Sequence, residues 1–351
     1  MPDFFKKDRD LFLAQTAHLW EALRGERIFI TGGTGFIGCW LLESFAWAND
    51  EFGLGASTTV LTRDPAAFQR KAPRLAFHPS IQLLAGDVRT FDFPTGSFRY
   101  LIHAATDANP QSAAGAPMET LETIVDGTRR TLEFSRHHGV EKYLLTSSGA
   151  VYGTQPAGIS HIPETYSGSP DSTRSGSVYG QGKRLAELLC AIYTAHYGIS
   201  CKIARCFAFA GPYLPADGHF AFGSFVRDAV QGLPIQINGD GTPVRSYLYA
   251  RDLAVWLWTI LLRGTPGTAY NVGSELEVTI GELANEVSGI LSPNLPIQIA
   301  QTAQPGKQPL RYVPSTRLAR EELSLRQYAD RRETILQTAA WYRQSLTMRC
   351  Q

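Results

Sequence analysis

The chain has 351 residues, of which 44% are hydrophobic and 19% are charged, and its formal net charge is +1. This composition is ordinary for a globular protein that is long enough for a large α/β domain and a smaller one. The near-zero net charge excludes a global field that would hold nucleic acid or a membrane surface, so we expect neither as a partner.

The apolar runs and the cysteines set further limits. No apolar run in the sequence is long enough to span a bilayer, and the N-terminus lacks the pattern of a signal peptide. The five cysteines are scattered, without CxxC spacing and without a nearby group of histidines. We therefore expect a cytoplasmic protein with reduced thiols and no bound metal.

The hydrophobic pattern predicts alternating strands and helices after an N-terminal helix over residues 3–23. We expect short buried strands over 27–31, 58–62, 81–84, 100–103, 142–146 and 201–207, and helices over 36–48, 118–138 and 177–197. Strands that alternate with helices form parallel βαβ units. The predicted fold class is therefore α/β, with a Rossmann-type doubly wound parallel sheet and helices on both faces.

Beyond residue 207 the pattern is less regular, with short strands near 235 and 245–248 and helices over 251–262 and 280–291. We predict a smaller C-terminal α/β substrate domain. The expected division is a helical extension over 1–24, a dinucleotide-binding domain over 25–207 to which 244–272 returns, and a substrate domain from 208–243 and 273–351. The segment 153–176 is dense in Gly, Pro and Ser, and a loop of that length is usually functional.

A glycine-rich turn follows the first strand and opens the next helix, as a dinucleotide-binding motif requires. Its glycines permit a tight turn, a close approach to the pyrophosphate and tight packing of helix on strand. The phosphates would lie at a helix N-terminus, where free N–H groups favour anions. The alternative is a plain tight turn. The cofactor residues predicted here are Gly32, Gly33, Thr34, Gly35, Phe36, Ile37 and Gly38.

Residues after the next strands also suit a dinucleotide. Asp87 and Val88 follow the third strand, where the carboxylate could accept from the adenine amino group, although Asp87 could equally cap a turn. The small residues Ala104, Ala105 and Thr106 close the fourth strand and leave room for the cofactor. His103 precedes them, and we expect it to be a packed core histidine without a chemical role.

The residue at the end of the second strand selects between NAD and NADP. An acidic residue there binds the ribose hydroxyls of NAD, whereas an arginine accepts the 2′-phosphate of NADP. This chain has Thr62 at that position, followed by Arg63 and Asp64. Arg63 favours NADP, unless it is a solvated loop cation or a shift of register brings Asp64 to the ribose of NAD.

A second motif joins a tyrosine and a lysine. Tyr179 and Lys183 are four residues apart and share one face of the predicted helix. A nearby ammonium ion and a cationic nicotinamide would lower the pKa of the phenol, which could then accept a proton from a substrate hydroxyl as hydride leaves for the cofactor. The lysine could also hold the nicotinamide ribose. A serine in segment 146–153 could polarise the reacting C–O bond.

These motifs, in this order, resemble the extended short-chain dehydrogenases/reductases, and among them the NAD(P)-dependent nucleotide-sugar epimerase/dehydratase family. The resemblance covers roughly residues 27–343. It implies Ser148 as the catalytic serine, Tyr179 as the base and Lys183 as its partner. It also implies NAD or NADP as cofactor, a nucleotide-diphosphate sugar as substrate, and a homodimer formed through a four-helix bundle of helices 118–138 and 177–197.

The same resemblance implies two arginines for the substrate diphosphate. Arg245 lies in a segment that is similar to the family's first phosphate-binding stretch, and Arg311 lies in one that is similar to the second. Guanidinium groups bind phosphate oxygens in pairs. The alternative for either arginine is an ion pair with Asp252 or Glu282. Further substrate contacts are expected from Ser148 and Gly149, and Phe220, Phe225 and Gln236 could line the pocket for the nucleotide base.

The residues after the catalytic serine narrow the reaction. The family's 4,6-dehydratases carry Asp-Glu there, and its decarboxylases carry Glu, because these reactions need additional proton transfer. Gly149 and Ala150 cannot transfer protons, and this small pair resembles the 4-epimerases and 4-ketoreductases. We predict a 4-epimerase of a nucleotide-linked hexose. The alternatives are an NADPH-dependent 4-ketoreductase, a 4,6-dehydratase that takes its acid from Glu164 or Asp171, and a non-catalytic dinucleotide-binding regulator.

Overall fold

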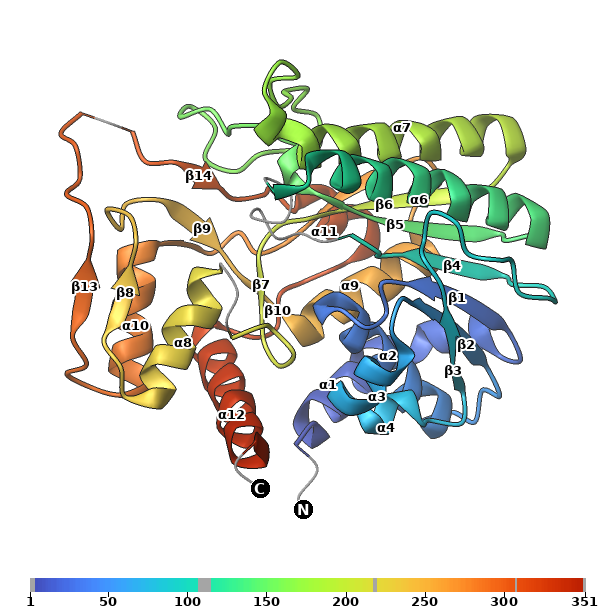
Figure 1. The fold of residues 1–351 in the computed structure, drawn as a ribbon, viewed down its shortest axis with the longest axis horizontal. Coiled ribbons are helices and arrows are strands. Elements are labelled where there is room, and N and C mark those ends of the chain that lie inside the picture. The colour runs from blue at the N-terminus through green and yellow to red at the C-terminus, as the bar shows by residue number, and fades with distance from the viewer. Residues whose placement is uncertain (1–3, 107–114, 217–219, 307, 350–351) are drawn as a thin grey trace.

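The computed structural model describes residues 4–106, 115–216, 220–306 and 308–349 (Figure 1). Its main sheet has seven parallel strands in the order β11-β6-β5-β4-β1-β2-β3. These strands are β1 (Arg27–Thr31), β2 (Ser57–Thr62), β3 (Ile81–Ala85), β4 (Tyr100–His103), β5 (Lys142–Ser148), β6 (Ser200–Cys206) and β11 (Ala269–Val272). The structure confirms the predicted α/β fold class.

Helices cover both faces of this sheet, because alternate residues of each strand point to opposite faces. Ile28 and Ile30 of β1 belong to one core, and Phe29 belongs to the other, where it stacks on Phe134 with ring centroids 4.4 Å apart. The first face carries α1 (Lys6–Thr16), α2 (Phe36–Glu51), α9 (Ala250–Arg263) and α11 (Arg317–Leu323), with the short α3 (Pro65–Lys71) and α4 (Pro73–Ala76) nearby. The second face carries α6 (Pro117–His138) and α7 (Val178–Tyr197) (Figure 1).

The N-terminal helix is part of the main core. It differs from the predicted single helix, because α1 ends at Thr16 and a 3-10 helix, η1 (Ala17–Leu23), follows. The Thr16 hydroxyl donates to the Phe12 carbonyl at 2.7 Å and accepts from Trp20 Nε1 at 2.9 Å. Asp8 of α1 pairs at 3.2 Å with Arg251 of α9, a side chain only 1% exposed. This buried pair ties the start of the chain to the sheet-forming lobe.

A smaller lobe lies beside the open end of the main sheet, at the left of Figure 1. Its core is formed largely by α8 (Ala221–Gln231), α10 (Ile280–Leu291) and α12 (Arg331–Arg349). Three small sheets accompany these helices: β9 (Val244–Ser246) with β12 (Glu277–Thr279) and β14 (Arg311–Tyr312), β8 (Ile235–Ile237) with β13 (Ile297–Ile299), and β7 (Phe209–Ala210) with β10 (Leu248–Tyr249). β9 therefore pairs with strands of the smaller lobe, although it lies within the range 244–272, whereas α9 packs on the main sheet and β11 is one of its strands.

The long segment between β5 and α7 contacts the residues that follow β14. It starts with a 3-10 helix, η2 (Gly149–Tyr152), and ends with another, η3 (Ser175–Ser177). Between them Ile162 forms a bridge with Pro314, and the Gln155 side chain accepts from the Val313 N–H at 2.9 Å. These contacts hold the residues after β14 against the end of β5, where the predicted catalytic serine lies.

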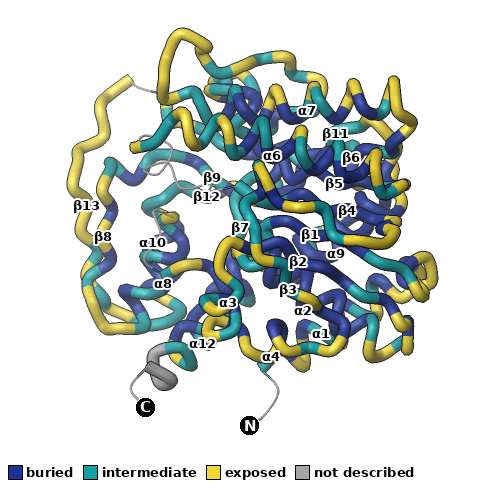
Figure 2. The backbone as a smooth tube through the Cα atoms, turned by 45° about the vertical axis from the view of Figure 1, so that its right-hand side comes forward, coloured by how far each residue is buried: buried dark blue, intermediate teal, exposed yellow. Residues whose placement is uncertain are grey.

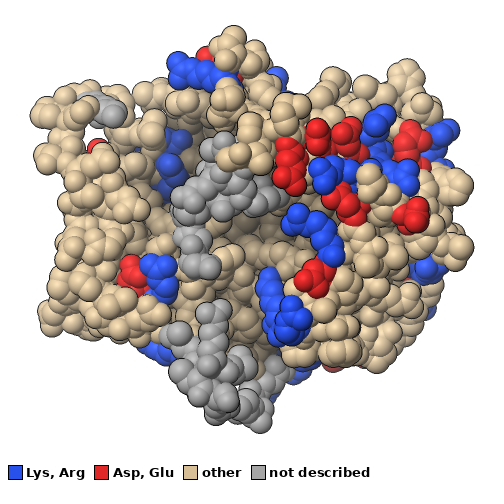
Figure 3. All heavy atoms as spheres, in the orientation of Figure 1, with Lys and Arg blue, Asp and Glu red and all other residues tan. Residues whose placement is uncertain are grey.

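The surface agrees with the near-zero net charge. Burial is deepest along the main strands, while α7 presents an exposed outer side (Figure 2). Basic and acidic side chains are interspersed on the face shown in Figure 3, without a field of one sign. Within the part of the chain that the structure describes, none of the helices combines the length and apolar character needed to cross a membrane.

Candidate active site

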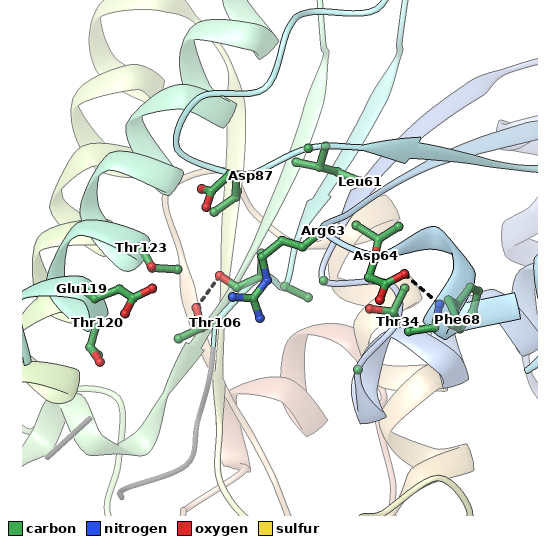
Figure 4. A pocket seen from close by; sticks show the side chains of 18 of the residues that line it. Thr34, Leu61, Arg63, Asp64, Phe68, Asp87, Thr106, Glu119, Thr120 and Thr123 are labelled. Atoms are coloured by element: carbon green, nitrogen blue, oxygen red, sulfur yellow. Dashed lines mark hydrogen bonds between the residues drawn. The ribbon is translucent and has the colours of Figure 1, made fainter. Parts of the chain in front are cut away.

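A cavity of about 680 Å³ opens at the carboxyl ends of the central strands (Figure 4). β1 lies between β2 and β4, and the order of the strands reverses there. Crevices at such a switch point are where doubly wound sheets bind ligands. The cavity's volume also lies in the usual range for cofactor sites. The predicted cofactor residues that line it are Gly32, Thr34, Gly35, Arg63, Asp87, Val88, Ala104, Ala105 and Thr106.

The glycine turn has the geometry that a dinucleotide phosphate needs. Gly32 has φ +71°, and a Cβ atom on it would lie 2.3 Å from the Ala104 carbonyl oxygen. A Cβ atom on Gly38 would lie 2.3 Å from the Gly32 carbonyl oxygen, so this glycine lets α2 pack on the turn. Within the described residues, no side chain caps the start of α2. Its first N–H groups can therefore bind an anion, which makes the turn fit a pyrophosphate.

The other predicted glycine-loop residues have a packing role. Gly33 faces Val60, and a Cβ atom on it would come within 2.6 Å of Val60 Cγ1. Phe36 and Ile37, the first two residues of α2, pack against the hydrophobic core and do not line the cavity. Lys71, which the sequence analysis missed, lines the cavity from α3, and its ammonium donates to the Thr34 carbonyl at 2.7 Å.

The end of β2 presents a cation to the cavity. The Arg63 side chain extends across the cavity toward Thr106, whereas Asp64 turns toward the start of α3 (Figure 4). The Asp64 carboxylate accepts from the Ala67 N–H at 2.9 Å and caps α3. Asp87 also faces the cavity, and the hydrogen bonds from Arg89 hold the pKa of its carboxyl below the usual value. Asp87 is therefore an ionised acceptor.

The tyrosine and lysine lie in the first turns of α7. A Cβ atom on Gly180 would lie 2.7 Å from the Ala150 carbonyl oxygen, so this glycine lets α7 approach η2 closely. The Lys183 ammonium lies 6.0 Å from the centroid of the Tyr179 ring. It donates at 2.8 Å to the Thr106 hydroxyl and at 2.8 Å to the Thr146 carbonyl. Burial lowers the pKa of Lys183 to about 8.

His103, the last residue of β4, connects this strand to neighbouring elements. Its Nδ1 lies 2.7 Å from the Thr31 hydroxyl and its Nε2 lies 3.2 Å from the Thr128 hydroxyl, which links β1, β4 and α6. Burial lowers the pKa of His103 to about 3. The ring is therefore neutral at physiological pH, as expected for a packed core histidine.

Ser148 ends β5 beside an unexpected phenol. Its Oγ lies 3.4 Å from the hydroxyl oxygen of Tyr312 and accepts from the Ala150 N–H at 3.1 Å. The Tyr312 ring packs on Phe207 with centroids 4.6 Å apart. A Cβ atom on Gly149 would lie 2.7 Å from Phe207 Cζ and 2.8 Å from the Tyr312 oxygen. Phe207 and Tyr312 therefore fill the space that a side chain at position 149 would need.

A half-buried ion pair lies next to the end of β5. The guanidinium of Arg205, on β6, forms a two-point contact with the Glu187 carboxylate of α7, at 2.7 and 3.0 Å. The same carboxylate accepts from the Ser147 hydroxyl at 2.5 Å, and Arg205 also donates to the Tyr152 hydroxyl at 2.8 Å. This network fixes β5 relative to α7, and hence Ser148 relative to Tyr179.

The predicted substrate residues divide into two groups. Arg245 donates to the carbonyls of Val244 and Leu310, at 2.9 and 3.4 Å, and no carboxylate of the described chain pairs with it. Its guanidinium can therefore bind an anion, and it lies 6.0 Å from the Tyr312 ring centroid. Arg311 forms an ion pair with Glu277 instead.

The residues expected around the base are spread over the smaller lobe. Phe220 precedes α8 and is 43% exposed, whereas Phe225 is 2% exposed and contributes to the hydrophobic core of that lobe. The Gln236 amide donates to the Gln298 side chain at 2.8 Å on an exposed strand. The structure therefore does not gather these three side chains around one space. A role of any of them in binding the base remains a prediction.

The two carboxylates considered as an additional acid accept hydrogen bonds from other residues. Glu164 accepts from the backbone N–H of Asn271 at 2.9 Å. Asp171 accepts from the Thr173 N–H and hydroxyl, at 2.9 and 2.6 Å. Among the described residues, no group of three or more His, Cys, Asp or Glu side chains is arranged to hold a metal ion.

A glycine-turn cavity at a switch point, with a serine and a tyrosine–lysine pair at the ends of adjoining elements, defines a dinucleotide-dependent enzyme of the short-chain dehydrogenase/reductase class. The chain belongs to the NAD dependent epimerase/dehydratase family, whose sequence pattern matches residues 28–273.

Similar sequences include two plant enzymes. UDP-glucuronic acid decarboxylase 1 of Arabidopsis thaliana is 29% identical over 299 residues, which cover 85% of this chain and 65% of that protein. UDP-glucuronic acid decarboxylase 3 of the same plant is 30% identical over 275 residues, which cover 78% of this chain and 77% of that protein. The chain thus spans somewhat less than two thirds of the first relative.

Solved structures share the fold across nearly the whole chain. An epimerase of Methanothermobacter thermautotrophicus aligns with a TM-score of 0.79 at 23% identity, covering 99% of this chain and 98% of that one. UDP-glucose 4-epimerase of Thermotoga maritima aligns at 0.76 and 21%, covering 91% and 99%. The dTDP-glucose 4,6-dehydratase DesIV of Streptomyces venezuelae, solved with NAD bound, aligns at 0.77 and 24%, covering 92% and 98%.

Proposed function

We propose that this enzyme interconverts two C4 epimers of a nucleotide-linked hexose. The observation that carries the proposal is that neither residue directly after Ser148 has a carboxylic acid. Phe207 and Tyr312 fill the space next to Gly149, and Ala150 has no proton to transfer. Epimerisation at C4 needs only one proton acceptor, one hydroxyl donor and the cofactor, so the residues present suffice.

The chain's own residues take distinct roles in this reaction. Tyr179 removes the proton from the C4 hydroxyl and returns it, and the adjacent Lys183 ammonium favours the phenolate. Ser148 donates to the C4 oxygen, where negative charge develops. Arg245 binds the diphosphate through its guanidinium. A bound nicotinamide supplies the redox step at C4.

A 4-ketoreductase that uses NADPH is the second candidate, and Arg63 favours it. Arg63 faces the cavity from the end of β2, and Asp64 is engaged as a helix cap, which leaves a cation where the adenosine ribose is expected. Lys71 adds a second cation to the same cavity. These groups support a preference for NADP over NAD.

The similar plant proteins are decarboxylases, which makes UDP-glucuronic acid a necessary comparison substrate. The family's decarboxylases carry a glutamate after the catalytic hydroxyl, where this chain has Gly149 and Ala150. We therefore propose that this chain does not decarboxylate. A 4,6-dehydratase is disfavoured for the same reason, because Glu164 and Asp171 bond to other groups.

A product assay distinguishes these reactions. The purified protein is incubated with NAD or NADP and one of five substrates: UDP-glucose, UDP-galactose, UDP-N-acetylglucosamine, UDP-glucuronic acid or dTDP-glucose. The products are separated by anion-exchange chromatography, and their masses are measured by mass spectrometry. An epimerase gives a product of unchanged mass that retains deuterium placed at C4. Loss of carbon dioxide or water from the sugar would contradict the proposal. Tyr179→Phe is expected to abolish turnover while dinucleotide binding persists.

We also propose that the chain is a cytoplasmic homodimer. Leu185, Leu188 and Ile192 recur on one side of α7 and are 41%, 55% and 39% exposed. Apolar side chains on one exposed helical stripe suit a helix–helix interface. Two copies that pair through α6 and α7 would bury this stripe in a four-helix bundle.

A further inference from the structure

Tyr312 brings a second phenol to the reacting end of β5, from a strand of the smaller lobe. The Tyr312 oxygen lies 3.4 Å from Ser148 Oγ and 3.4 Å from the carbonyl oxygen of Cys206. Burial raises the pKa of Tyr312, and the neighbouring Tyr179 raises it further. Tyr312 is therefore neutral over the working pH range, and it can donate one proton but cannot act as the base.

Counting donors and acceptors at Ser148 shows what this phenol can do. A serine hydroxyl has one proton to donate and two lone pairs that accept. The Ala150 N–H occupies one lone pair at 3.1 Å. If Tyr312 donates to the second lone pair, it cannot accept the serine proton, which is then left to donate to a bound substrate. If Tyr312 donates to Cys206 instead, its oxygen can accept the serine proton and compete with the substrate.

We propose that Tyr312 is a positioning residue that donates to Ser148 Oγ and so directs the serine proton onto the reacting oxygen of the sugar when the substrate binds. This proposal rests on the proposed role of Ser148. A hydrogen bond received by the serine oxygen also polarises its O–H group and strengthens it as a donor. Gly149 is required for the arrangement, because a side chain there would displace the phenol.

The contact between Ser148 and Tyr312 connects the two lobes at the reacting group. Ser148 belongs to the dinucleotide-binding lobe, whereas Tyr312 lies on β14, next to β9 and Arg245. A diphosphate held by Arg245 would therefore act on the same strand pair that carries the phenol. The Tyr312 ring also packs on Phe207, so removal of the hydroxyl alone leaves the ring in place.

The test is a double-mutant cycle with Tyr312→Phe and Ser148→Ala, assayed with UDP-glucose as the probe. We expect Ser148→Ala to lower kcat about a hundredfold. Tyr312→Phe should lower kcat about fivefold to tenfold, with the KM for UDP-glucose changed less than twofold. The double variant should be no slower than Ser148→Ala, because the phenol acts only through the serine. A multiplicative loss, or a faster Tyr312→Phe enzyme, would overturn the proposal.

Tyr143→Phe is the matched control. It also removes a buried phenol hydroxyl, one that lies 2.8 Å from the Thr131 hydroxyl and away from the reacting group. It should leave kcat within twofold. Normal turnover in Ser148→Ala would instead refute the proposed function. If the wild-type enzyme does not turn over UDP-glucose, the same cycle is read in urea midpoints of the apoprotein, where fully additive shifts would overturn the proposed contact.

Discussion

Replacing Lys183 by methionine should make the stability of the apoprotein less dependent on pH. Burial lowers the pKa of Lys183 from 10.5 to about 8. Between these values the unfolded chain binds more protons than the folded one, so the free energy of unfolding rises with pH. The difference between the two pKa values corresponds to about 3 kcal/mol in the free energy of unfolding. Between pH 7 and pH 10 the wild-type protein should gain about 2.5 kcal/mol relative to Lys183→Met.

Urea unfolding of both proteins, followed by tryptophan fluorescence at pH 7, 8, 9 and 10, measures this difference directly. Other titrating groups contribute equally to both proteins and cancel in the comparison. Lys6→Met, which removes an exposed lysine, is the control and should track the wild type at every pH. Parallel curves for wild type and Lys183→Met would refute a buried ammonium. Lys183→Met should also lose turnover, because it removes the partner of Tyr179.

Three further predictions concern the cavity, the reacting end and the helix surface. Arg63→Ala should weaken NADP binding at least tenfold and change NAD binding less than twofold, because a charged contact to the 2′-phosphate is lost. Both affinities are measured by calorimetry, and an equal loss for the two dinucleotides would contradict this prediction. Gly149→Ala should lower kcat about tenfold while sparing dinucleotide binding, because its Cβ atom would meet Phe207 and Tyr312; an unchanged kcat would show that the pocket yields. Leu188→Glu should convert a dimer into a monomer in light scattering, and a monomeric wild type would remove the basis for this expectation.

Local sequence patterns were sufficient to predict most of the fold and of the cofactor site. Buried strands alternate with helices in the sequence, and a parallel sheet follows because each connection is a helical crossover. The glycine turn was recognisable because its residues are consecutive, and the structure places Gly32 and Gly35 at the cavity. The break in the N-terminal helix at Thr16 was missed, because it depends on a hydroxyl that bonds within the turn.

The substrate side was harder to predict, because its contacts join residues far apart in sequence. Tyr312 has no motif of its own, and it reaches Ser148 only because the residues after β14 pair with the loop that follows β5. Arg311 and Arg245 are both arginines in Gly- and Pro-containing stretches. Only the folded chain brings Glu277 to Arg311, and among the residues that the structure describes it pairs no carboxylate with Arg245.

The buried pair between Asp8 and Arg251 has a consequence for biosynthesis. Its two residues are 243 positions apart. A ribosome that adds about 5–20 residues per second needs about 12–50 s to make the intervening chain. Until α9 emerges, the sides of α1 and α2 that it covers are open to water and Asp8 has no guanidinium partner. α1, which is made before α9, is thus enclosed only after α9 has emerged, and until then the nascent chain offers apolar surface that chaperones can bind.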